Sequence, residues 1–400
     1  MSEMTEELKE VVEGNKILDE LEKGPWPSHV KEVRKTRYPV KMYGASLYAK
    51  RDFWTTGGYV SVPGVPTGIL MRVTSRPDIG ESANVVRVYI PSGQFLSSRM
   101  LNNLADFADK YGVGMVHAIT TSADMELPGI PKERIKEFAA DFRANSGMDV
   151  GSTGDAFRNT TCCVGPALCE YANIDSLKTR DDFYGEFFDY AKFPTMPHKI
   201  KLKISACPLD CARATQKGDV AVVGSWVGGP EVDPASMGAL SAEEKRGLVD
   251  SCPTGALSLD DGGIGVKGED CIQCMQCIKM SRGALTPGLK KVYQVLVGGK
   301  LRGKKGPFTA KLVADLDTEE EVFAMIHKLA DVYSDQAARK ERLGDLIMRI
   351  GMKNFLGLMG IVPDSKQVKD LRTNIFYGVS AEARKKATEE LNAAVGGASN

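Results

Sequence analysis

The chain has no excess of either charge and no long run of apolar residues. Its 400 residues carry 52 Lys+Arg against 52 Asp+Glu. This balance excludes the strongly basic profile of a nucleic-acid-binding protein and the acidic bias of a disordered one. No segment approaches the roughly 20 consecutive apolar residues that a membrane-spanning helix needs. Residues 1–23 are acidic and amphipathic, unlike a signal peptide. We therefore expect a cytoplasmic globular protein.

Fibrous and low-complexity classes are excluded by the mixed composition. At about 150 residues per domain, the length predicts about two to three domains with a large core, and 42% hydrophobic residues agree with that. Glycine, with 41 residues, exceeds its usual share of about 7%. This excess favours many tight turns or close approaches of the backbone to a bulky bound group.

Cysteine is absent from most of the chain, and all nine cysteines lie between residues 162 and 277. Because the N-terminus does not resemble an export signal, we expect reduced thiols that bind metal or do chemistry, not disulfides. We interpret Cys162 as an inert neighbour. The other eight form two groups of four: Cys163, Cys169, Cys207 and Cys211; Cys252, Cys271, Cys274 and Cys277.

In the second group, Cys271, Cys274 and Cys277 have the C-x2-C-x2-C spacing of bacterial ferredoxins. Three thiolates on one such loop bind three irons of a cubane, and a remote Cys-Pro supplies the fourth ligand. Cys252-Pro253 has that form. Where a second cluster would need another cysteine the chain has Ser281, so the spacing predicts one [4Fe–4S] cluster. Tetrahedral zinc is the alternative, and it favours paired C-x2-C motifs instead.

The first group has a different spacing, with C-x5-C from Cys163 to Cys169 and C-x3-C from Cys207 to Cys211. Neither pair matches a zinc-finger or haem-attachment motif. Two separated loops can hold a cubane if they converge. The residues alone leave two interpretations open, cluster ligands and buried structural thiols.

A row of lysines leads into Cys207. Residues 199–205 alternate between cations and apolar residues, so a β-strand would carry Lys199, Lys201 and Lys203 on one face. A solvated strand face is the ordinary interpretation of such a row. Because the strand ends at a cysteine, we favour cations that face an anionic macrocycle or an oxyanion.

Three arginines are candidates for the same kind of contact. Arg87 lies in the strand-like segment 85–90, and Arg158 lies in the Gly- and Ser-rich segment before Cys163. Arg72 is a weaker candidate. Any one arginine taken alone is more often a surface or ion-pair residue. Two histidines near these segments, His117 and His198, are interpreted as structural and not as ligands.

With these cysteine pairs, the lysine strand and the ferredoxin-type insert in this order, the chain resembles the siroheme sulfite and nitrite reductase family. The resemblance is strongest to alpha-type subunits of its dissimilatory branch. It covers nearly the whole chain and includes residues 18–28, 86–88, 91–93 and 341–345. The cysteine layout is its most specific part, and the other segments corroborate it.

The resemblance implies one siroheme and two [4Fe–4S] clusters per chain. One cluster would be held by Cys163, Cys169, Cys207 and Cys211, with Cys211 also the axial ligand of the siroheme iron. Arg87, Arg158, Lys201 and Lys203 would line the siroheme pocket, with Arg72 as a further cofactor contact. These residues would bind sulfite and supply protons, while the cofactors would deliver the electrons that reduce it to the sulfide level. The ferredoxin-type cluster would feed electrons to this centre.

The resemblance also implies partners and leaves alternatives. The partners would be a homologous beta subunit in an alpha2beta2 heterotetramer, a small sulfur-carrier protein with a C-terminal cysteine, and sulfite; the electron donor is not indicated. Many siroheme reductases carry Thr-Thr-Arg where this chain has Thr120-Thr121-Ser122. The alternatives are therefore a structural electron-relay subunit with an inactive or iron-free tetrapyrrole, or the same enzyme acting on nitrite or oxidising sulfide.

The periodicity predicts an α/β (α+β) fold of the siroheme sulfite reductase type. The predicted domains are an N-terminal arm (1–34), a ferredoxin-like half-domain (35–160), a siroheme and [4Fe–4S] domain with a helical C-terminus (161–235 plus 301–400), and an inserted ferredoxin domain (236–300). Predicted helices are residues 4–22, 97–111, 131–145, 181–192, 319–334 and 336–350. Predicted strands are residues 85–90, 114–120, 199–205 and 219–226.

Overall fold

The computed structural model describes residues 16, 18–19, 22–23, 31, 59–61, 67–72, 84–112, 114–119, 124–261, 263–301 and 306–362. Most of the predicted helix 4–22 and the segment Thr120-Thr121-Ser122 lie outside these ranges. The chain divides into two compact units, residues 1–159 with 187–199, and residues 160–186 with 200–400. Each is described by itself, and the predicted four-domain division stays a prediction.

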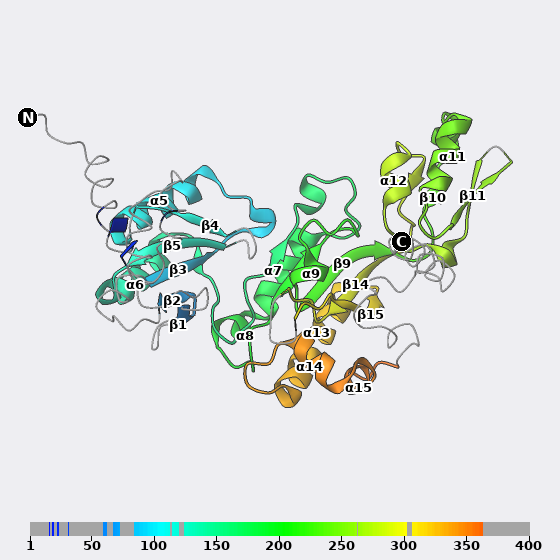
Figure 1. The fold of residues 1–400 in the computed structure, drawn as a ribbon. Coiled ribbons are helices and arrows are strands. Elements are labelled where there is room, and N and C mark those ends of the chain that lie inside the picture. The colour runs from blue at the N-terminus through cyan, green and yellow to red at the C-terminus, as the bar shows by residue number, and fades with distance from the viewer. Residues whose placement is uncertain are drawn as a thin grey trace, which may run out of the picture. The chain divides into compact units, whose positions relative to one another are not determined.

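The first unit is built on an antiparallel sheet with the strand order β1-β2-β3-β5-β4, in which β6 also pairs with β3. Two helices pack on it (Figure 1). The strands are β1 (Tyr59–Ser61), β2 (Ile69–Arg72), β3 (Asn84–Tyr89), β4 (His117–Ile119), β5 (Asp124–Ile130) and β6 (Asp149–Val150). The helical segments are η2 (Ser92–Gln94), α5 (Ser98–Tyr111), η3 (Lys132–Arg134), α6 (Ile135–Asn145) and α8 (Phe188–Lys192).

Local sequence explains why these helices form where they do. Ser97 caps α5 by accepting a hydrogen bond from the Met100 amide, as N-cap serines do. Buried side chains recur on the inner face of α5 and meet the aromatic residues of α6 in a packed aromatic cluster. The predicted helix 97–111 and strand 85–90 are thus confirmed to within one residue, and the predicted helix 131–145 divides into η3 and α6.

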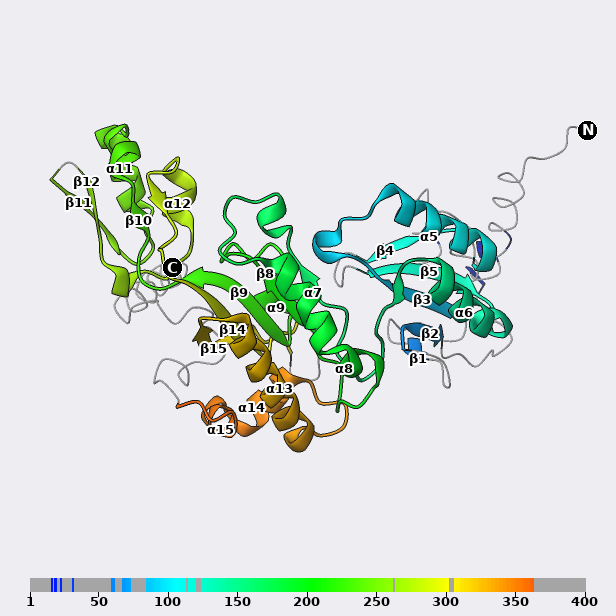
Figure 2. The same ribbon diagram turned by 180° about the vertical axis from the view of Figure 1, so that it is seen from behind.

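The second unit contains a mixed sheet in the order β15-β14-β9-β8-β7. Strands β7, β8 and β9 are parallel, and β14 and β15 are antiparallel to their neighbours. The reverse view in Figure 2 shows helices α7 and α9 beside strands β8 and β9. The strands are β7 (Thr161–Cys162), β8 (Leu202–Ser205), β9 (Val220–Trp226), β14 (Lys291–Val297) and β15 (Lys311–Leu316). The helical segments are η4 (Gly165–Ala167), α7 (Ser176–Glu186) and α9 (Ala214–Lys217).

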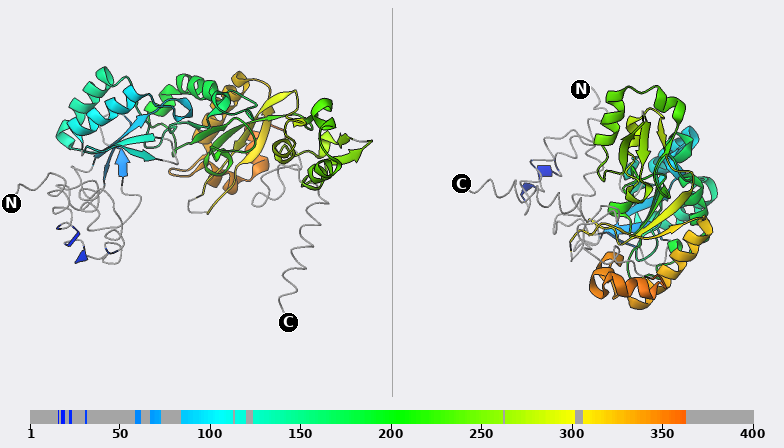
Figure 3. Two further views of the ribbon diagram at one scale, coloured as in Figure 1. Left: turned by 90° about the horizontal axis from the view of Figure 1, so that it is seen from above. Right: turned by 90° about the vertical axis from the view of Figure 1, so that its right-hand side faces the viewer.

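A small subdomain is inserted between β9 and β14. Its core is formed by apolar side chains that include Trp226, Met237, Leu257 and Ile278, and two cysteines pack against this core. In Figure 3 the subdomain is the yellow-green part, which β9 and β14 join to the rest of the unit. Its elements are β10 (Glu231–Val232), α10 (Pro234–Gly238), α11 (Ala242–Asp250), β11 (Leu257–Asp260), β12 (Gly263–Val266), η5 (Gly268–Asp270), α12 (Gln276–Met280) and β13 (Leu285–Thr286).

Three helices close the described part of the second unit: α13 (Glu319–Gln336), α14 (Leu343–Ile350) and α15 (Met352–Leu358). Thr318 and Glu321 form a reciprocal capping box at the start of α13, and the predicted helix 319–334 is confirmed to within two residues. The predicted helix 336–350 starts only at Leu343. Lys340 has a positive φ of 64°, and the Glu341 carboxylate accepts a hydrogen bond from the Ala338 amide, so the chain forms a turn first.

Two further sequence predictions required correction. The predicted helix 181–192 is two helices, α7 and α8, separated at Phe187. The predicted strand 199–205 begins only at Leu202. In the described part of the chain no helix is both long and apolar enough to cross a membrane.

Candidate metal centres

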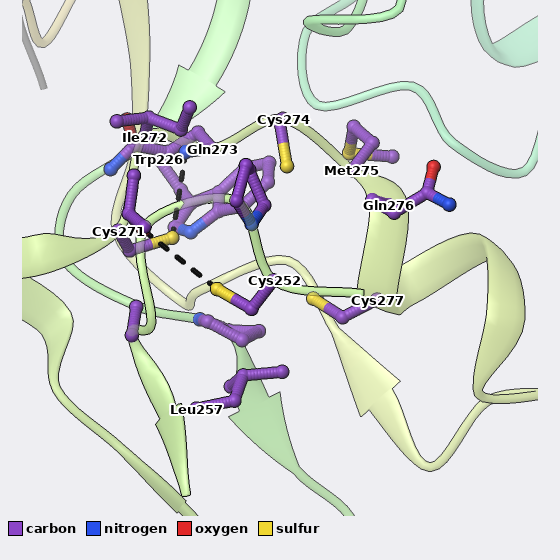
Figure 4. A pocket seen from close by; sticks show the side chains of 14 residues that line it. Trp226, Cys252, Leu257, Cys271, Ile272, Gln273, Cys274, Met275, Gln276 and Cys277 are labelled. Atoms are coloured by element: carbon purple, nitrogen blue, oxygen red, sulfur yellow. Dashed lines mark hydrogen bonds between the residues drawn. The ribbon is translucent and has the colours of Figure 1, made fainter. Parts of the chain in front are cut away.

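The cysteines of the insert surround one pocket. Cys271 and Cys274 lie in the loop that leads into α12, Cys277 lies in the first turn of α12, and Cys252 lies two residues beyond the end of α11. Figure 4 shows the four thiol side chains arranged around a common space. The sequence grouped these residues by spacing, and the fold brings all four together.

The loop between these cysteines turns tightly because two of its residues have left-handed backbone. Gln273 has φ 52° and Met275 has φ 66°, a conformation that side chains other than glycine rarely adopt. The Gln273 amide donates a hydrogen bond to Cys271 Sγ at 3.4 Å. The Gln273 side chain donates to the Gly228 carbonyl at 3.0 Å, which holds the loop against the end of β9.

Four ionised cysteines without a bound metal centre would be unfavourable in this pocket. Burial raises the pKa of Cys277 to about 12 and also raises the pKa of Cys271. The other cysteines of the group raise both values further, because like charges at close range repel. A bound cationic centre would relieve this repulsion. The donor set, four thiols and a backbone amide in an apolar pocket, fits a [4Fe–4S] cluster.

The cysteines of the first group are brought together by two parallel strands. Cys163 directly follows β7, and Cys207 lies just beyond the end of β8. These strands are neighbours, with Thr161 opposite Lys203 and Cys162 opposite Ile204. Because the carboxyl ends of parallel strands meet at one edge of a sheet, the two loops converge there although they are some forty residues apart.

Electrostatics shows that this group converges as well. Burial raises the pKa of Cys207 to about 11, and Cys169, Cys163 and Cys211 raise it further. Burial also raises the pKa of Cys211, with added repulsion from Cys163 and Cys169. These four thiols are therefore close enough to interact electrostatically, as the ligands of one cluster are.

The members of this group differ in exposure. Cys207 is buried, Cys163 and Cys169 are intermediate, and Cys211 is exposed. Cys163 Sγ accepts a hydrogen bond from the Ala206 amide at 3.1 Å, a contact typical of cluster thiolates. Cys162 is buried in β7, and consecutive strand residues point to opposite faces. It is therefore directed away from its neighbour Cys163.

Sequence reasoning missed Asp210, which organises the C-x3-C loop. Its Oδ1 accepts hydrogen bonds from the Ser205 hydroxyl at 2.7 Å and the Ala214 amide at 2.6 Å. Its Oδ2 accepts from the Thr215 amide at 3.0 Å and the Thr215 hydroxyl at 2.6 Å. One carboxylate thus joins the end of β8 to the start of α9, with both loop cysteines between them. Its position inside the motif was the available signal.

The lysine row is not a solvated face. Lys203 is only 3% exposed, because β8 is buried on both faces and helices α7 and α9 pack against it. Its ammonium group donates to the Ala212 carbonyl at 3.4 Å, which places it beside the loop residue that follows Cys211. Lys201 is half-buried and lies two residues earlier. Lys199 lies before the strand, in the first unit.

Sequence reasoning also missed a buried ion pair next to the backbone of Lys201. Asp219, fully buried at the start of β9, accepts from Arg342 at 2.7 Å and from the Lys201 amide at 2.9 Å. Burial raises the pKa of Asp219, and Arg342 opposes that shift. The pair fixes the backbone of Lys201 to the N-terminus of α14. Arg342 belongs to the segment 341–345 that carried part of the resemblance.

Arg87 lies on β3 of the first unit and is held by carboxylates. Its Nε donates to Glu126 at 3.1 Å and lies 4.0 Å from Asp124. Gly151 packs against it, because a Cβ at Gly151 would lie 3.2 Å from the Arg87 Cβ and 2.4 Å from the Asn159 amide nitrogen. The small residues here serve internal packing, and the carboxylates orient the guanidinium group.

The remaining predicted residues are also in the first unit. Arg158 is half-buried and donates through Nε to the Gly154 carbonyl at 3.2 Å. The backbone of Arg72 ends β2, and its side chain lies outside the described part. His117 bonds Glu126 at 3.0 Å and His198 bonds Asp155 at 2.9 Å. Both histidines therefore have the carboxylate partners expected of structural residues.

Comparison with known proteins identifies the family of the chain. The family model for the nitrite and sulphite reductase 4Fe-4S domain matches residues 153–366. The model for the nitrite/sulfite reductase ferredoxin-like half domain matches residues 80–145. Together they cover the β3 to α6 part of the first unit and nearly all described residues of the second.

Similar proteins come from several organisms. The chain is 32% identical to the alpha subunit of dissimilatory-type sulfite reductase from Allochromatium vinosum, over 90% of this chain and 93% of that protein. It is 26% identical to the alpha subunit from Nitratidesulfovibrio vulgaris, over 90% and 93%, and 25% identical to the beta subunit from that organism, over 78% and 84%. The solved structure of dissimilatory sulfite reductase I has the same fold, with a TM-score of 0.74 at 24% identity over 89% of this chain and 92% of that one.

These matches show that the chain belongs to the nitrite and sulfite reductase family. It is an oxidoreductase of the dissimilatory sulfite reductase type, similar to the alpha subunits over more of its length than to the beta subunits. The predicted resemblance and the predicted α/β fold class are confirmed. Siroheme and 4Fe–4S centres are the cofactors that this family implies.

Proposed function

We propose that the chain is the alpha subunit of a dissimilatory-type sulfite reductase that reduces sulfite to the sulfide level. The observation that carries the proposal is that one unit gathers two cysteine quartets, one of them at the end of a strand bearing a buried lysine. We assign one siroheme and two [4Fe–4S] clusters to the chain. When bound, these groups would supply the electrons for the reduction.

The proposed ligand roles follow the two quartets. Cys252, Cys271, Cys274 and Cys277 would hold the ferredoxin-type cluster. Cys163, Cys169, Cys207 and Cys211 would hold the second cluster, and Cys211 would share its sulfur with the siroheme iron as axial ligand. Cys211 is the exposed member of that quartet, so its sulfur is the one best placed to reach a second metal.

The proposed role of the cations is to bind sulfite and the cofactor and to hold protons near departing oxygens. Lys203 is buried, and a buried ammonium interacts with a nearby anion more strongly than an exposed one does. Lys201 is tied through its backbone to the Asp219 carboxylate. The same role is proposed for Arg87 and Arg158, and Glu126 orients the Arg87 guanidinium group.

The proposed assembly is an alpha2beta2 heterotetramer in the cytoplasm. The similarity to both alpha and beta subunits supports a paired beta subunit. A small sulfur-carrier protein with a C-terminal cysteine would accept the reduced sulfur, and the electron donor is left unassigned. The segment Thr120-Thr121-Ser122, which motivated the alternative of an inactive relay subunit, lies outside the described residues. No observation on the described residues favours an inactive relay subunit, nitrite reduction or sulfide oxidation over sulfite reduction.

The test is a Cys211→Ser variant of the complex, with Cys162→Ser as the matched control. Both remove one thiol from the same region, but only Cys211 belongs to the proposed quartet. We expect Cys211→Ser to abolish the electronic coupling between siroheme and cluster in low-temperature electron paramagnetic resonance, while Cys162→Ser preserves it. A coupled signal assigned to this chain that survives in Cys211→Ser would contradict the axial assignment.

A further inference from the structure

Trp226 has a buried donor that the fold leaves unsatisfied. It is the last residue of β9 and is 2% exposed, yet its indole Nε1 has no hydrogen-bond partner in the protein. Leaving a buried donor unpaired costs about 1–3 kcal/mol, so such groups in native proteins call for an explanation. Trp226 also lines the pocket of Cys252, Cys271, Cys274 and Cys277.

The indole ring is fixed in place from two sides. The backbone of Trp226 is paired with Lys291 of β14, and the Lys291 ammonium lies 6.0 Å from the ring centroid. A Cβ at Gly288 would lie only 2.5 Å from the ring atom Cδ1. Glycine at position 288 therefore lets the backbone pack directly against the indole edge that carries the nitrogen, and this packing limits rotation of the ring.

The walls of the pocket combine apolar side chains with the four thiols, and Thr254, Gln273 and Gln276 also line it. Leu257 and Met275 contribute apolar side chains to the same core as Trp226. Figure 4 shows Trp226 beside Cys271 at the rim of the space that the four cysteines surround. Indole is a hydrogen-bond donor only, whereas thiolate and sulfide sulfurs of iron–sulfur clusters accept such bonds.

We propose that Trp226 is a positioning residue whose Nε1–H donates a hydrogen bond to a sulfur atom of the cluster in this pocket, and that this bond sets the reduction potential of the cluster. The inference rests on the proposed assignment of a [4Fe–4S] cluster to these four cysteines. Reduction adds one negative charge to the cluster. A donor aimed at its sulfur stabilises that charge, so Trp226 makes the cluster easier to reduce.

The experiment compares Trp226→Phe with Leu257→Val in the full-length chain assembled with its partner. Phenylalanine keeps an apolar ring and removes the donor. The Leu257 variant disturbs the same pocket by one methylene and changes no polar group. Iron and acid-labile sulfide are counted first, and the potential of the ferredoxin-type cluster is then measured by redox titration followed by electron paramagnetic resonance.

We expect both variants to retain the cluster, and the equilibrium constant for reduction to fall about tenfold only in Trp226→Phe, which is about 59 mV for one electron. Equal potentials in Trp226→Phe and wild type, with the cluster present, would overturn this inference alone. A wild-type protein without this cluster would contradict the proposed function as well.

A second measurement does not depend on the folding of the variant. The wild-type protein is grown with ¹⁵N-indole tryptophan, and the reduced cluster is examined for magnetic coupling to ¹⁵N. We expect a coupling that deuterium exchange at the indole nitrogen also reveals. Absence of both couplings in the reduced, fully loaded protein would show that Nε1–H does not contact the cluster.

Discussion

Single residues decide how the cysteine motifs become sites. The C-x3-C spacing supplies two thiols, but the loop that carries them needs a fixed shape. Asp210 provides it by accepting four hydrogen bonds from Ser205, Ala214 and Thr215. Asp210 itself has a left-handed φ of 49°, so the loop pays a local strain that these bonds offset.

Replacing Asp210 by Ala should impair the first quartet selectively. Each hydrogen bond to a charged group contributes about 1.5–3 kcal/mol, so the loop loses most of the energy that orders Cys207 and Cys211. We expect the variant to lose siroheme and about half of its iron and labile sulfide, while the ferredoxin-type signal persists. Cofactor analysis and visible absorption measure both.

Asp250→Ala is the control for this prediction, because Asp250 is an exposed carboxylate at the end of α11 in the same unit. It should keep full cofactor content. Full loading of Asp210→Ala with siroheme would show that the four hydrogen bonds do not determine the shape of the loop.

At the scale of elements, the parallel strands β7 and β8 explain why two distant cysteine pairs meet. Their carboxyl ends lie at one edge of the sheet, and each continues into a cysteine loop. The ion pair between Asp219 and Arg342 joins the same sheet to the N-terminus of α14. Removing one partner from such a buried pair leaves an uncompensated charge and costs about 3–5 kcal/mol.

Arg342→Met should therefore destabilise the protein at neutral pH. Burial already raises the pKa of Asp219, and the loss of the guanidinium group raises it further. A carboxyl group whose pKa is raised by folding favours the folded state below its unfolded pKa of about 3.9, and this contribution is lost as pH rises. The deficit of Arg342→Met should thus be largest near pH 7 and shrink as the pH falls towards 4.

Urea unfolding at pH 7 and pH 5, at matched cofactor loading, measures this deficit. Adding Asp219→Asn to Arg342→Met removes the buried charge and should restore part of the stability at pH 7. A deficit that is the same at both pH values would indicate that lost packing of Arg342, and not the unpaired Asp219 carboxylate, is responsible.

At the scale of the whole molecule, both quartets belong to the same unit and share a core. Tyr171 and Leu209, from the loops of the first quartet, pack against the apolar cluster that also contacts Cys252 and Cys277 of the second. An electron passing between the two centres can therefore remain within one packed body. In the proposed function, this one unit would hold both the entry cluster and the reaction centre.

Cys274→Ser should separate electron entry at the ferredoxin-type cluster from sulfite binding at the siroheme. We expect about half of the labile sulfide to be lost, sulfite still to change the siroheme absorption of the reduced protein, and turnover with an external electron donor to fall at least tenfold. The reciprocal variant Cys211→Ser should keep the ferredoxin-type signal. Undiminished turnover in Cys274→Ser would show that electrons enter by another route.

Local sequence was enough to predict the family, the two proposed ligand groups and several of the longer helices, but it predicted only four of the fifteen strands that the structure describes. Cysteine spacing is local, since three of the proposed ligands lie within seven residues, from Cys271 to Cys277. Helical and strand periodicity are local too, and so is the capping box of Thr318 and Glu321. Such features depend on neighbours along the chain, so they can be predicted without a fold.

Only the tertiary structure decided the surroundings of these groups. Lys203 is buried because helices α7 and α9 pack against β8, which the alternation of lysines could not reveal. Asp219 meets Arg342 across more than one hundred residues, and Trp226 at the end of β9 lines the pocket of cysteines that follow much later in the chain. Burial and partner choice arise from packing of distant segments, and these set the charge, the hydrogen bonds and the polarity at each centre.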